Sequence, residues 1–208
     1  MKLFYAPPSP FVRKVCVCLD ETGQADAVER VDAMGTPLDS GTIPVAHNPL
    51  GKIPCLLLED GQAIYDSRNI TRYLDARAGG RLYPEGDGLW RTLTLESTAD
   101  GVLDAAVLMV YERRCRPEAI VSEDWLAGQW SKVTRALDAI ERDWMDHLEG
   151  PLDMGVIATG VALEYLDFRH PDRPWRPGRD RLAAWQAEFS RRPSMTATVP
   201  RDMAIGRG

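Results

Sequence analysis

Cysteine and histidine are scarce in this chain, which limits the metal, disulfide and redox chemistry to expect of it. The 208 residues include four cysteines and three histidines. The cysteines form no C-x-x-C pair and are too sparse for the disulfide framework of a small secreted domain. The histidines lack the spacing of a metal site. We therefore expect no metal and a reducing, cytoplasmic location. The residues concerned are Cys16, Cys18, Cys55, Cys115, His47, His147 and His170.

An excess of positive charge and long apolar runs are also missing. The formal net charge is −6, whereas binding to nucleic acid or to an anionic membrane needs a dense basic face. No apolar run approaches the length of a membrane-spanning helix. The first residues reach Pro7 and Pro8 without the apolar core of a signal peptide. The sequence thus predicts small molecules or proteins as partners, with no nucleic acid and no membrane.

Apolar content is ample, and its pattern changes near residue 80. Hydrophobic residues make up 44% of the chain, enough for one large domain or two small ones. The first part alternates strand-like runs with helical patterns, as a small α/β unit does. Asp60 and Gly61 indicate a tight hairpin between two antiparallel strands. The expected strands are 3–5, 28–31, 55–58 and 63–65, the expected helices are 11–22 and 67–78, and 32–47 is a loop with room for a short irregular helix.

A segment rich in glycine and proline separates this unit from a helical remainder. Residues 80–88 are the best candidate for an interdomain linker. Beyond it, apolar residues repeat at helical spacing, so we expect an α/β domain at 1–79 and an all-α helical bundle at 89–208. The expected helices run over 89–114, from Ser122 through Trp144, from Ile157 to His170, and from Leu182 to a close at Pro193.

Ser9 stands where the first helix is expected to begin, in the run SPFVRK (9–14). Serine is a preferred N-cap, and proline is favoured at the first helical position, where no amide hydrogen is needed. Free backbone amides and the helix dipole favour an anion at such an end, and Ser9 adds a donor hydroxyl. Ser9 is therefore a candidate for holding a thiolate or a carboxylate, with plain capping as the alternative.

The run NPLGKIP (48–54) leads into the strand expected at 55–58. Proline cannot donate to a sheet ladder, and a cis Ile53-Pro54 bond would turn the backbone sharply. The amide and carbonyl of Ile53 would then remain available at the sheet edge, where an extended peptide-like ligand pairs as an added strand. A rigid loop is the alternative.

Asp66 and Ser67 begin the next expected helix, with Ser67 as the expected N-cap. Asp66 suits the ammonium of an α-amino-acid head group, and Ser67 with the open amides suits its carboxylate. Ordinary capping explains the pair as well. The three segments fall at one edge of one small sheet, and together they match an amino-acid head, a peptide middle and a sulfur or oxygen anion. Glutathione has these parts.

With these three segments the chain resembles the glutathione S-transferases, specifically bacterial members with a serine at the active site, over nearly its full length. The resemblance implies a thioredoxin-like N-terminal domain and a helical C-terminal domain that carries a second-substrate pocket and a dimer interface. It also implies a role for each matching residue. Ser9 hydrogen-bonds the sulfur of glutathione, and the other glutathione-binding residues are Lys52, Ile53, Pro54, Asp66 and Ser67.

The reaction implied is the attack of a glutathione thiolate on a small electrophile. Serine is too weak an acid to act as the base, but its hydroxyl and the helix end stabilise a thiolate. Phe11, Tyr111 and Arg114 are candidates for the pocket of the second substrate, although arginines at a helix end also simply complement its dipole. Relatives are usually homodimers, and Asp100 or Asp104 is a candidate for a contact across the dimer. A solvent-facing acid is the alternative.

Two other functions stay open at this point. One is a non-enzymatic adaptor in stress, transcription or translation complexes, and the other is a glutathione-dependent isomerase, dehalogenase or peroxidase. Thiol-reductase members carry cysteine in place of Ser9, so disulfide exchange is disfavoured. Asp66 is shorter than the Glu or Gln frequent at its place, and the capping box at Asp153 is incomplete because Val156 follows at the third position.

Overall fold

The computed structural model of the protein describes residues 1–203. It divides the chain into two compact units, one made of residues 1–80 with 197–203 and the other of residues 81–196. The sequence assigned 89–208 to the helical domain, whereas residues 197–203 group with the first unit. Residues 204–208 of that assignment lie outside the described residues.

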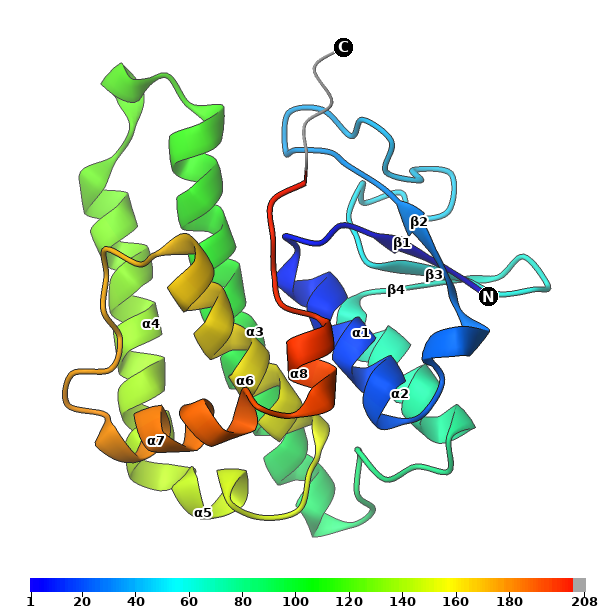
Figure 1. The fold of residues 1–208 in the computed structure, drawn as a ribbon. Helices are drawn as coiled ribbons and strands as arrows, with labels where there is room; N and C mark the ends of the chain where they lie inside the picture. The colour runs from blue at the N-terminus through cyan, green and yellow to red at the C-terminus, as the bar shows by residue number, and fades with distance from the viewer. Residues whose placement is uncertain (204–208) are drawn as a thin grey trace. The chain divides into compact units, whose positions relative to one another are not determined.

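A four-stranded mixed sheet forms the first unit (Figure 1). β1 pairs parallel with β2 and antiparallel with β3, and β3 pairs antiparallel with β4 across the turn at Asp60 and Gly61. The tight hairpin predicted from these two residues is confirmed. The strands lie in the order β2-β1-β3-β4 and comprise β1 Lys2–Tyr5, β2 Glu29–Asp32, β3 Cys55–Leu57 and β4 Ala63–Tyr65.

Helices α1 (Pro10–Glu21) and α2 (Ser67–Arg77) lie together on one face of this sheet (Figure 1). Their apolar stripes are fully buried, as Val12 and Leu19 on α1 and Leu74 on α2 illustrate. Helical spacing of apolar residues predicts this burial. A short 3-10 turn, η1 (Ala25–Ala27), leads from α1 towards β2.

The loop between β2 and β3 contains no helix in the described structure, although the sequence left room for a short one. Its backbone folds back on itself too closely for that. A Cβ added to Gly35 would lie 2.5 Å from the carbonyl oxygen of Ser40, and one added to Gly41 would lie 2.4 Å from that of Met34. The two glycines permit a compact turn here, and Gly41 adopts a φ of +52°.

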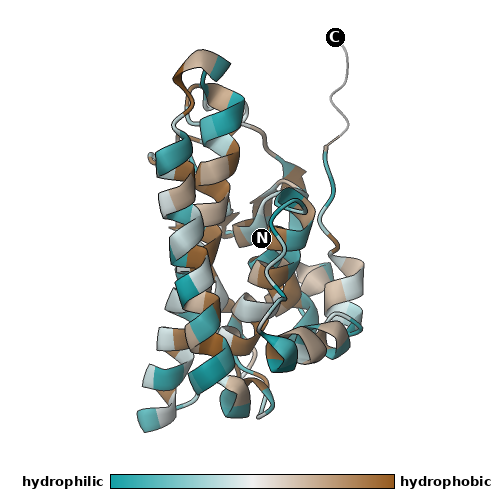
Figure 2. Ribbon diagram, turned by 90° about the vertical axis from the view of Figure 1, so that its left-hand side faces the viewer, coloured by the Kyte–Doolittle hydropathy of each residue, from teal (hydrophilic) through white to brown (hydrophobic). Residues whose placement is uncertain are grey.

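The second unit is made of helices. Figure 2 shows hydrophilic and hydrophobic residues alternating along the long helices α3 and α4, as expected where one side of a helix is buried. The short helices α5 and α8 and the 3-10 turn η2 were not predicted from the sequence. The elements are α3 Asp87–Cys115, η2 Glu118–Ile120, α4 Glu123–Asp143, α5 Met145–Leu148, α6 Met154–Arg169, α7 Asp180–Phe189 and α8 Pro193–Ala197.

Two helix boundaries differ from the expected ones for a local reason. α3 begins at Asp87, inside the segment expected to be a linker. α7 ends at Phe189, and Pro193 opens α8 instead of closing α7. Proline suits the first turn of a helix because its missing amide hydrogen is not needed there. Ser122 caps α4 as predicted, and its Oγ accepts a hydrogen bond from the Trp125 amide at 3.3 Å.

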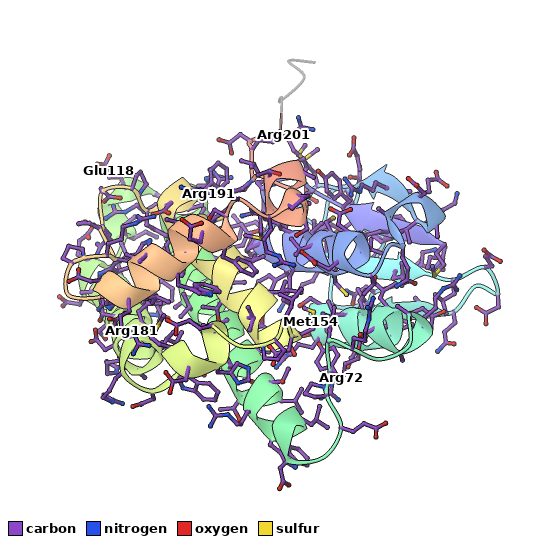
Figure 3. All side chains as sticks on the ribbon, turned by 60° about the horizontal axis from the view of Figure 1, so that its bottom comes forward. Arg72, Glu118, Met154, Arg181, Arg191 and Arg201 are labelled. Carbon is purple, nitrogen blue, oxygen red and sulfur yellow. The ribbon has the colours of Figure 1, made fainter. Side chains whose placement is uncertain are left out.

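Helix α6 forms the core of the second unit, with every residue from 153 to 163 buried. Figure 3 labels Met154 in its first turn. Asp153 caps the helix: it accepts the Val156 amide at 2.9 Å, His147 Nε2 at 2.7 Å and the Thr92 hydroxyl. The incomplete capping box is therefore replaced by one carboxylate with three partners, two of which come from neighbouring segments.

Candidate functional site

The register of the sheet brings the three predicted segments to one edge. Cys55, the first residue of β3, lies opposite both Phe4 of β1 and Tyr65 of β4. The chain leaves β1 and β4 at this edge, shortly before Ser9 and Asp66, and it enters β3 at the same edge. The segments that contain Ser9, Ile53 and Asp66 are far apart in the sequence, and all three therefore lie at one edge of the sheet in the first unit.

Ser9 is the N-cap of α1. Its backbone is extended, with φ −82° and ψ 119°, and its Oγ accepts a hydrogen bond from the Val12 amide at 3.4 Å. Pro10 follows at the start of the helix, as predicted. A hydroxyl has one proton to donate and lone pairs to accept with. Because capping uses the oxygen as an acceptor, the O–H of this half-buried serine remains available to donate to an anion.

The turn into β3 exposes the backbone of Ile53. The Ile53-Pro54 peptide bond is cis. Asn48 is buried and holds the turn, since its Nδ2 donates to the Lys52 carbonyl at 2.8 Å and its Oδ1 accepts the Leu50 amide at 3.1 Å. Over residues 1–203, the amide and carbonyl of Ile53 make no hydrogen bond. They are therefore available to a ligand, and the Asn48 side chain that holds this turn was not among the predicted site residues.

Asp66, and not Ser67, is the N-cap of α2; Ser67 is the first helical residue and is buried. Asp66 Oδ1 accepts the Arg68 amide at 2.9 Å, and the Arg68 guanidinium contacts the two carboxylate oxygens at 3.2 and 3.3 Å. Burial opposes ionisation of Asp66, but the hydrogen bonds from Arg68 outweigh it and hold the pKa of Asp66 below its ordinary value. The carboxylate is therefore charged at neutral pH.

Asp66 also has a strained backbone, with a φ of +42°. It is the one residue other than glycine with a positive φ in the described chain. Such strain persists where the surrounding structure holds it, and it clusters at ligand-binding positions. This conformation turns the chain from the end of β4 into the first turn of α2. The Asp66 carboxylate and the first amides of α2 therefore lie at the same edge of the sheet.

Two basic residues of α1 that were not among the predicted site residues are buried. Lys14 is fully inaccessible and Arg13 is 3% exposed. The charge of Lys14 favours the ionised form of Asp66. Arg13 Nε donates to Thr198 Oγ1 at 3.4 Å, which joins α1 to the C-terminal segment of the same unit. The one signal in the sequence is that Lys14 lies four residues after the buried Pro10, on the apolar stripe of the helix.

The remaining predicted site residues lie on different elements. Tyr111 is half-buried and Arg114 is exposed in the last turns of α3, where the charge of Arg114 acts on the Tyr111 phenol. Phe11 is half-buried on α1, in the other unit. On α3, Asp100 is buried within the chain and Asp104 is exposed.

Three further findings concern metal binding, the acidity of one thiol and membrane crossing. Among residues 1–203, no group of three or more His, Cys, Asp or Glu side chains is placed to hold a metal ion. Burial raises the pKa of Cys16 to about 11, so its thiol stays protonated. None of the helices described is both long enough and apolar enough to cross a membrane.

Comparison with known proteins gives the family. Family models of the glutathione S-transferase N-terminal and C-terminal domains match residues 8–77 and 123–187. The uncharacterized GST-like protein YibF of Escherichia coli K12 is 33% identical over 204 residues, which cover 96% of this chain and 98% of that protein. The chain belongs to the glutathione S-transferase family.

Solved structures of this family share the fold. A glutathione transferase family member from Pseudomonas fluorescens Pf-5, with bound glutathione, has a TM-score of 0.94 and 46% identity over 96% of this chain and 98% of that one. A structure from the same bacterium with bound S-(propanoic acid)-glutathione has a TM-score of 0.90 and 46% identity over 97% and 100% of the two chains. A glutathione S-transferase of Methylobacterium radiotolerans JCM 2831, in complex with glutathione sulfonate, has a TM-score of 0.84 and 36% identity over 98% and 96%. The predicted α/β domain followed by a helical domain is confirmed.

Proposed function

We propose that this transferase binds glutathione at the sheet edge and activates its thiol as a thiolate for attack on a small electrophile in the cytoplasm. The proposal rests on one observation: the three predicted segments meet at the same edge of the sheet. There, a hydroxyl at one helix N-terminus, an unpaired peptide unit and a charged carboxylate at a second helix N-terminus meet the three chemical parts of glutathione.

Each group has a distinct role in the proposal. The backbone of Ile53, held by the Pro54 turn, pairs with the cysteinyl unit as an added strand. Asp66 binds the γ-glutamyl ammonium, and the Ser67 hydroxyl and first amides of α2 bind its carboxylate. The exposed Lys52 side chain supplies a positive charge for the glycyl carboxylate.

Ser9 acts on the sulfur without forming a bond to it. Its O–H donates to the thiolate while its oxygen keeps the Val12 amide, and the N-terminus of α1 adds a positive potential. Stabilising the anion lowers the thiol pKa, so the proton leaves to solvent before the attack. The thiolate then forms a carbon–sulfur bond, and the electrophile releases its leaving group with the bonding electrons or takes up a proton from solvent.

The relatives support this reaction class. The Pseudomonas and Methylobacterium structures hold glutathione or glutathione sulfonate. The S-(propanoic acid)-glutathione bound to the second Pseudomonas structure is a glutathione whose sulfur carries a carbon substituent. A product of conjugation has the same kind of carbon–sulfur bond.

The assembly we propose is a homodimer through α3. This helix carries two of the exposed large apolar residues, Trp90 and Leu108, which are 66% and 46% exposed. Asp104 is exposed on the same helix and is the better placed of the two acids for a contact with a neighbour, because Asp100 is buried within its own chain.

The test compares the Ser9→Ala and Ser122→Ala variants with the wild type in conjugation of glutathione to 1-chloro-2,4-dinitrobenzene. Both variants lose a serine N-cap, but Ser122 caps α4 in the other unit. We expect Ser9→Ala to lower kcat/KM by about tenfold to a hundredfold, the value of a hydrogen bond to a charged group. Ser122→Ala should leave it unchanged.

Equal activity in the wild type and Ser9→Ala would refute the proposed role of Ser9. Retention of the wild type on immobilised glutathione, measured in parallel, separates binding from catalysis. Retention without conjugation of any electrophile would instead favour a glutathione-binding adaptor.

A further inference from the structure

Lys14 of α1 is a buried cation inside the first unit. It is fully inaccessible to solvent and is one of the largest side chains with no exposed surface. A lysine ammonium rarely leaves water, because its burial costs several kcal/mol unless nearby charges and hydrogen bonds compensate for it. The fold must therefore supply negative or polar groups around Lys14.

Contacts between α1 and α2 place Lys14 against the start of α2. The two helices lie side by side (Figure 1), and Cys18 Sγ lies 3.9 Å from the Thr71 carbonyl oxygen. Beyond the end of α1, Gln24 Nε2 donates to the Leu74 carbonyl at 2.9 Å. The two contacts advance along both helices together, so α1 and α2 run in the same direction. Residues four apart share a helix face, so Lys14, one turn before Cys18, faces the first turn of α2, one turn before Thr71.

The first turn of α2 brings polar groups of its own to this interface. Ser67 is 4% exposed, and Asp66 caps the helix with a φ of +42°. Burial raises the pKa of Asp66, whereas the hydrogen bonds and charge of Arg68, and then the charge of Lys14, lower it. The buried ammonium and the capping carboxylate therefore interact across the two helices.

The two cations that act on Asp66 differ in their exposure. The Arg68 side chain is 50% exposed, and its Nε lies 3.2 Å from Asp66 Oδ1. An exposed guanidinium is screened by salt and can turn into water when an incoming ammonium takes over the carboxylate oxygens. Lys14 has no such freedom, because no part of it is exposed. Of the two cations, Lys14 is the one whose charge stays in place while a ligand binds.

We infer that Lys14 is a positioning residue of the proposed glutathione site: its buried ammonium, lying behind the first turn of α2, holds the Asp66 carboxylate in place for the γ-glutamyl ammonium of glutathione. This inference rests on the proposed function and deepens it by adding a residue that does not touch the ligand. The same charge adds to the positive potential of the α2 N-terminus, which favours the γ-glutamyl carboxylate. Lys14 therefore supports the binding of both charges of the amino-acid head group from inside the protein.

The experiment measures the Kd for glutathione by calorimetry at neutral pH in the wild type and in variants of Lys14. Lys14→Met removes the charge but keeps a side chain of similar length. We expect it to raise the Kd about fivefold, the upper end for a single ion pair. Lys14→Gln, the second neutral variant, should do the same. Lys14→Arg keeps the charge and should keep most of the affinity.

Cys18→Ala is the matched control, since it trims the next side chain on the same face of α1 without changing a charge. It should leave the Kd unchanged. A double-mutant cycle with Asp66→Asn separates positioning from a general loss of packing. If Lys14 acts through the Asp66 carboxylate, Lys14→Met should have almost no effect on the Kd once residue 66 is asparagine.

Titration of the Asp66 carboxyl carbon by NMR, without glutathione, supplies a readout that a loss of packing alone would not move. The charged groups that act on this carboxyl are Arg68 and Lys14. Cys18 and Asp75, which are buried one and two turns further along their helices, are unchanged by the variant. Loss of the Lys14 charge should raise the pKa of Asp66, so protonation should begin at a higher pH in Lys14→Met than in the wild type. Lys14→Arg should titrate like the wild type.

Three results would overturn the inference while leaving the proposed function intact. One is a Kd that neither Lys14→Met nor Lys14→Gln changes, or that Cys18→Ala raises to the same extent. Another is an effect of Lys14→Met that is equal with and without the Asp66 carboxylate, and the third is an unchanged pKa of Asp66 in Lys14→Met. A wild type that binds no glutathione would instead refute the proposed function, and the inference with it.

Discussion

At the scale of single residues, the proposed site depends on polar groups that would serve the fold and a ligand at once. Ser9 caps α1 through its oxygen and keeps its proton for an anion. Asp66 caps α2 while its negative charge, supported by Arg68 and Lys14, faces the border of the sheet. Such double use in the proposed site explains why capping and binding stay alternatives at the level of sequence, because the same atoms would do both.

Substitution of asparagine for Asp66 separates its capping of α2 from its proposed binding of glutathione. Asparagine is as good an N-cap as aspartate, so Asp66→Asn should change the free energy of unfolding by only a few tenths of a kcal/mol. Without the charge that binds the ammonium, the Kd for glutathione should rise about tenfold. Calorimetric titration and thermal unfolding of the same samples measure both effects. An unchanged Kd would remove Asp66 from the binding site.

At the scale of elements, the caps fix where helices begin, and the strongest cap is the one in the core. Asp153 holds the first turn of α6, the Thr92 hydroxyl of α3 and His147 of α5. Within residues 1–203, the side chain of Ser122 makes the capping bond on α4 and holds no neighbouring segment. Loss of the capping side chain should therefore destabilise the second unit more at α6, where it is Asp153, than at α4, where it is Ser122.

Asp153→Ala should lower the free energy of unfolding by about 3 kcal/mol, because it removes a cap and leaves buried donors without their acceptor. Ser122→Ala should cost about 1 kcal/mol. Urea unfolding followed by far-ultraviolet circular dichroism gives both values. Equal losses in the two variants would show that the contacts of Asp153 beyond the cap contribute nothing.

His170, the C-cap residue of α6, makes the stability of the helical unit depend on pH. Its Nε2 lies 3.0 Å from the carbonyl oxygen of Ala106 on α3. Burial lowers the pKa of His170, against the smaller opposing effect of this hydrogen bond. The unfolded chain therefore binds more protons, so the free energy of unfolding should fall as the pH drops below about 6.5. His170→Gln should flatten that slope, and an identical slope in the variant would contradict the assignment.

The elements were predictable wherever local signals agreed. The helix stripes and the Asp60-Gly61 hairpin follow from spacing and turn chemistry alone. The choice between Asp66 and Ser67 as N-cap does not, because both are good caps and the positive φ of Asp66 that decides it comes from the packing of β4 and α2. The short helix α5 depends on tertiary contacts, such as the hydrogen bond from Trp185 Nε1 of α7 to the Leu148 carbonyl at 2.9 Å.

At the scale of the whole molecule, the division of labour follows the two units. In the proposed function, the sheet edge of the first unit supplies the glutathione-binding groups, and helix α3 of the second unit supplies the dimer contact. The family models of the N-terminal and C-terminal domains match residues 8–77 and 123–187, which lie in the first and the second unit.

The proposed dimer predicts a mass in solution of twice the 23.2 kDa of the chain. Trp90→Glu should shift the protein towards the monomer, because a buried unpaired charge destabilises an interface. Leu38→Glu is the control, since Leu38 is 75% exposed on the loop of the first unit. Sedimentation velocity measures the masses. A monomeric wild type would contradict the proposal, and an unaffected Trp90→Glu would exclude Trp90 from the interface.

The most direct measurement of the central claim is the pH titration of the thiolate absorbance of glutathione bound to the wild type and to Ser9→Ala. If the Ser9 hydroxyl stabilises the thiolate, the pKa of the bound thiol lies below that of free glutathione and rises by about one unit or more in the variant. The same thiol pKa in wild type and variant, or a bound thiol that titrates like free glutathione, would contradict the account.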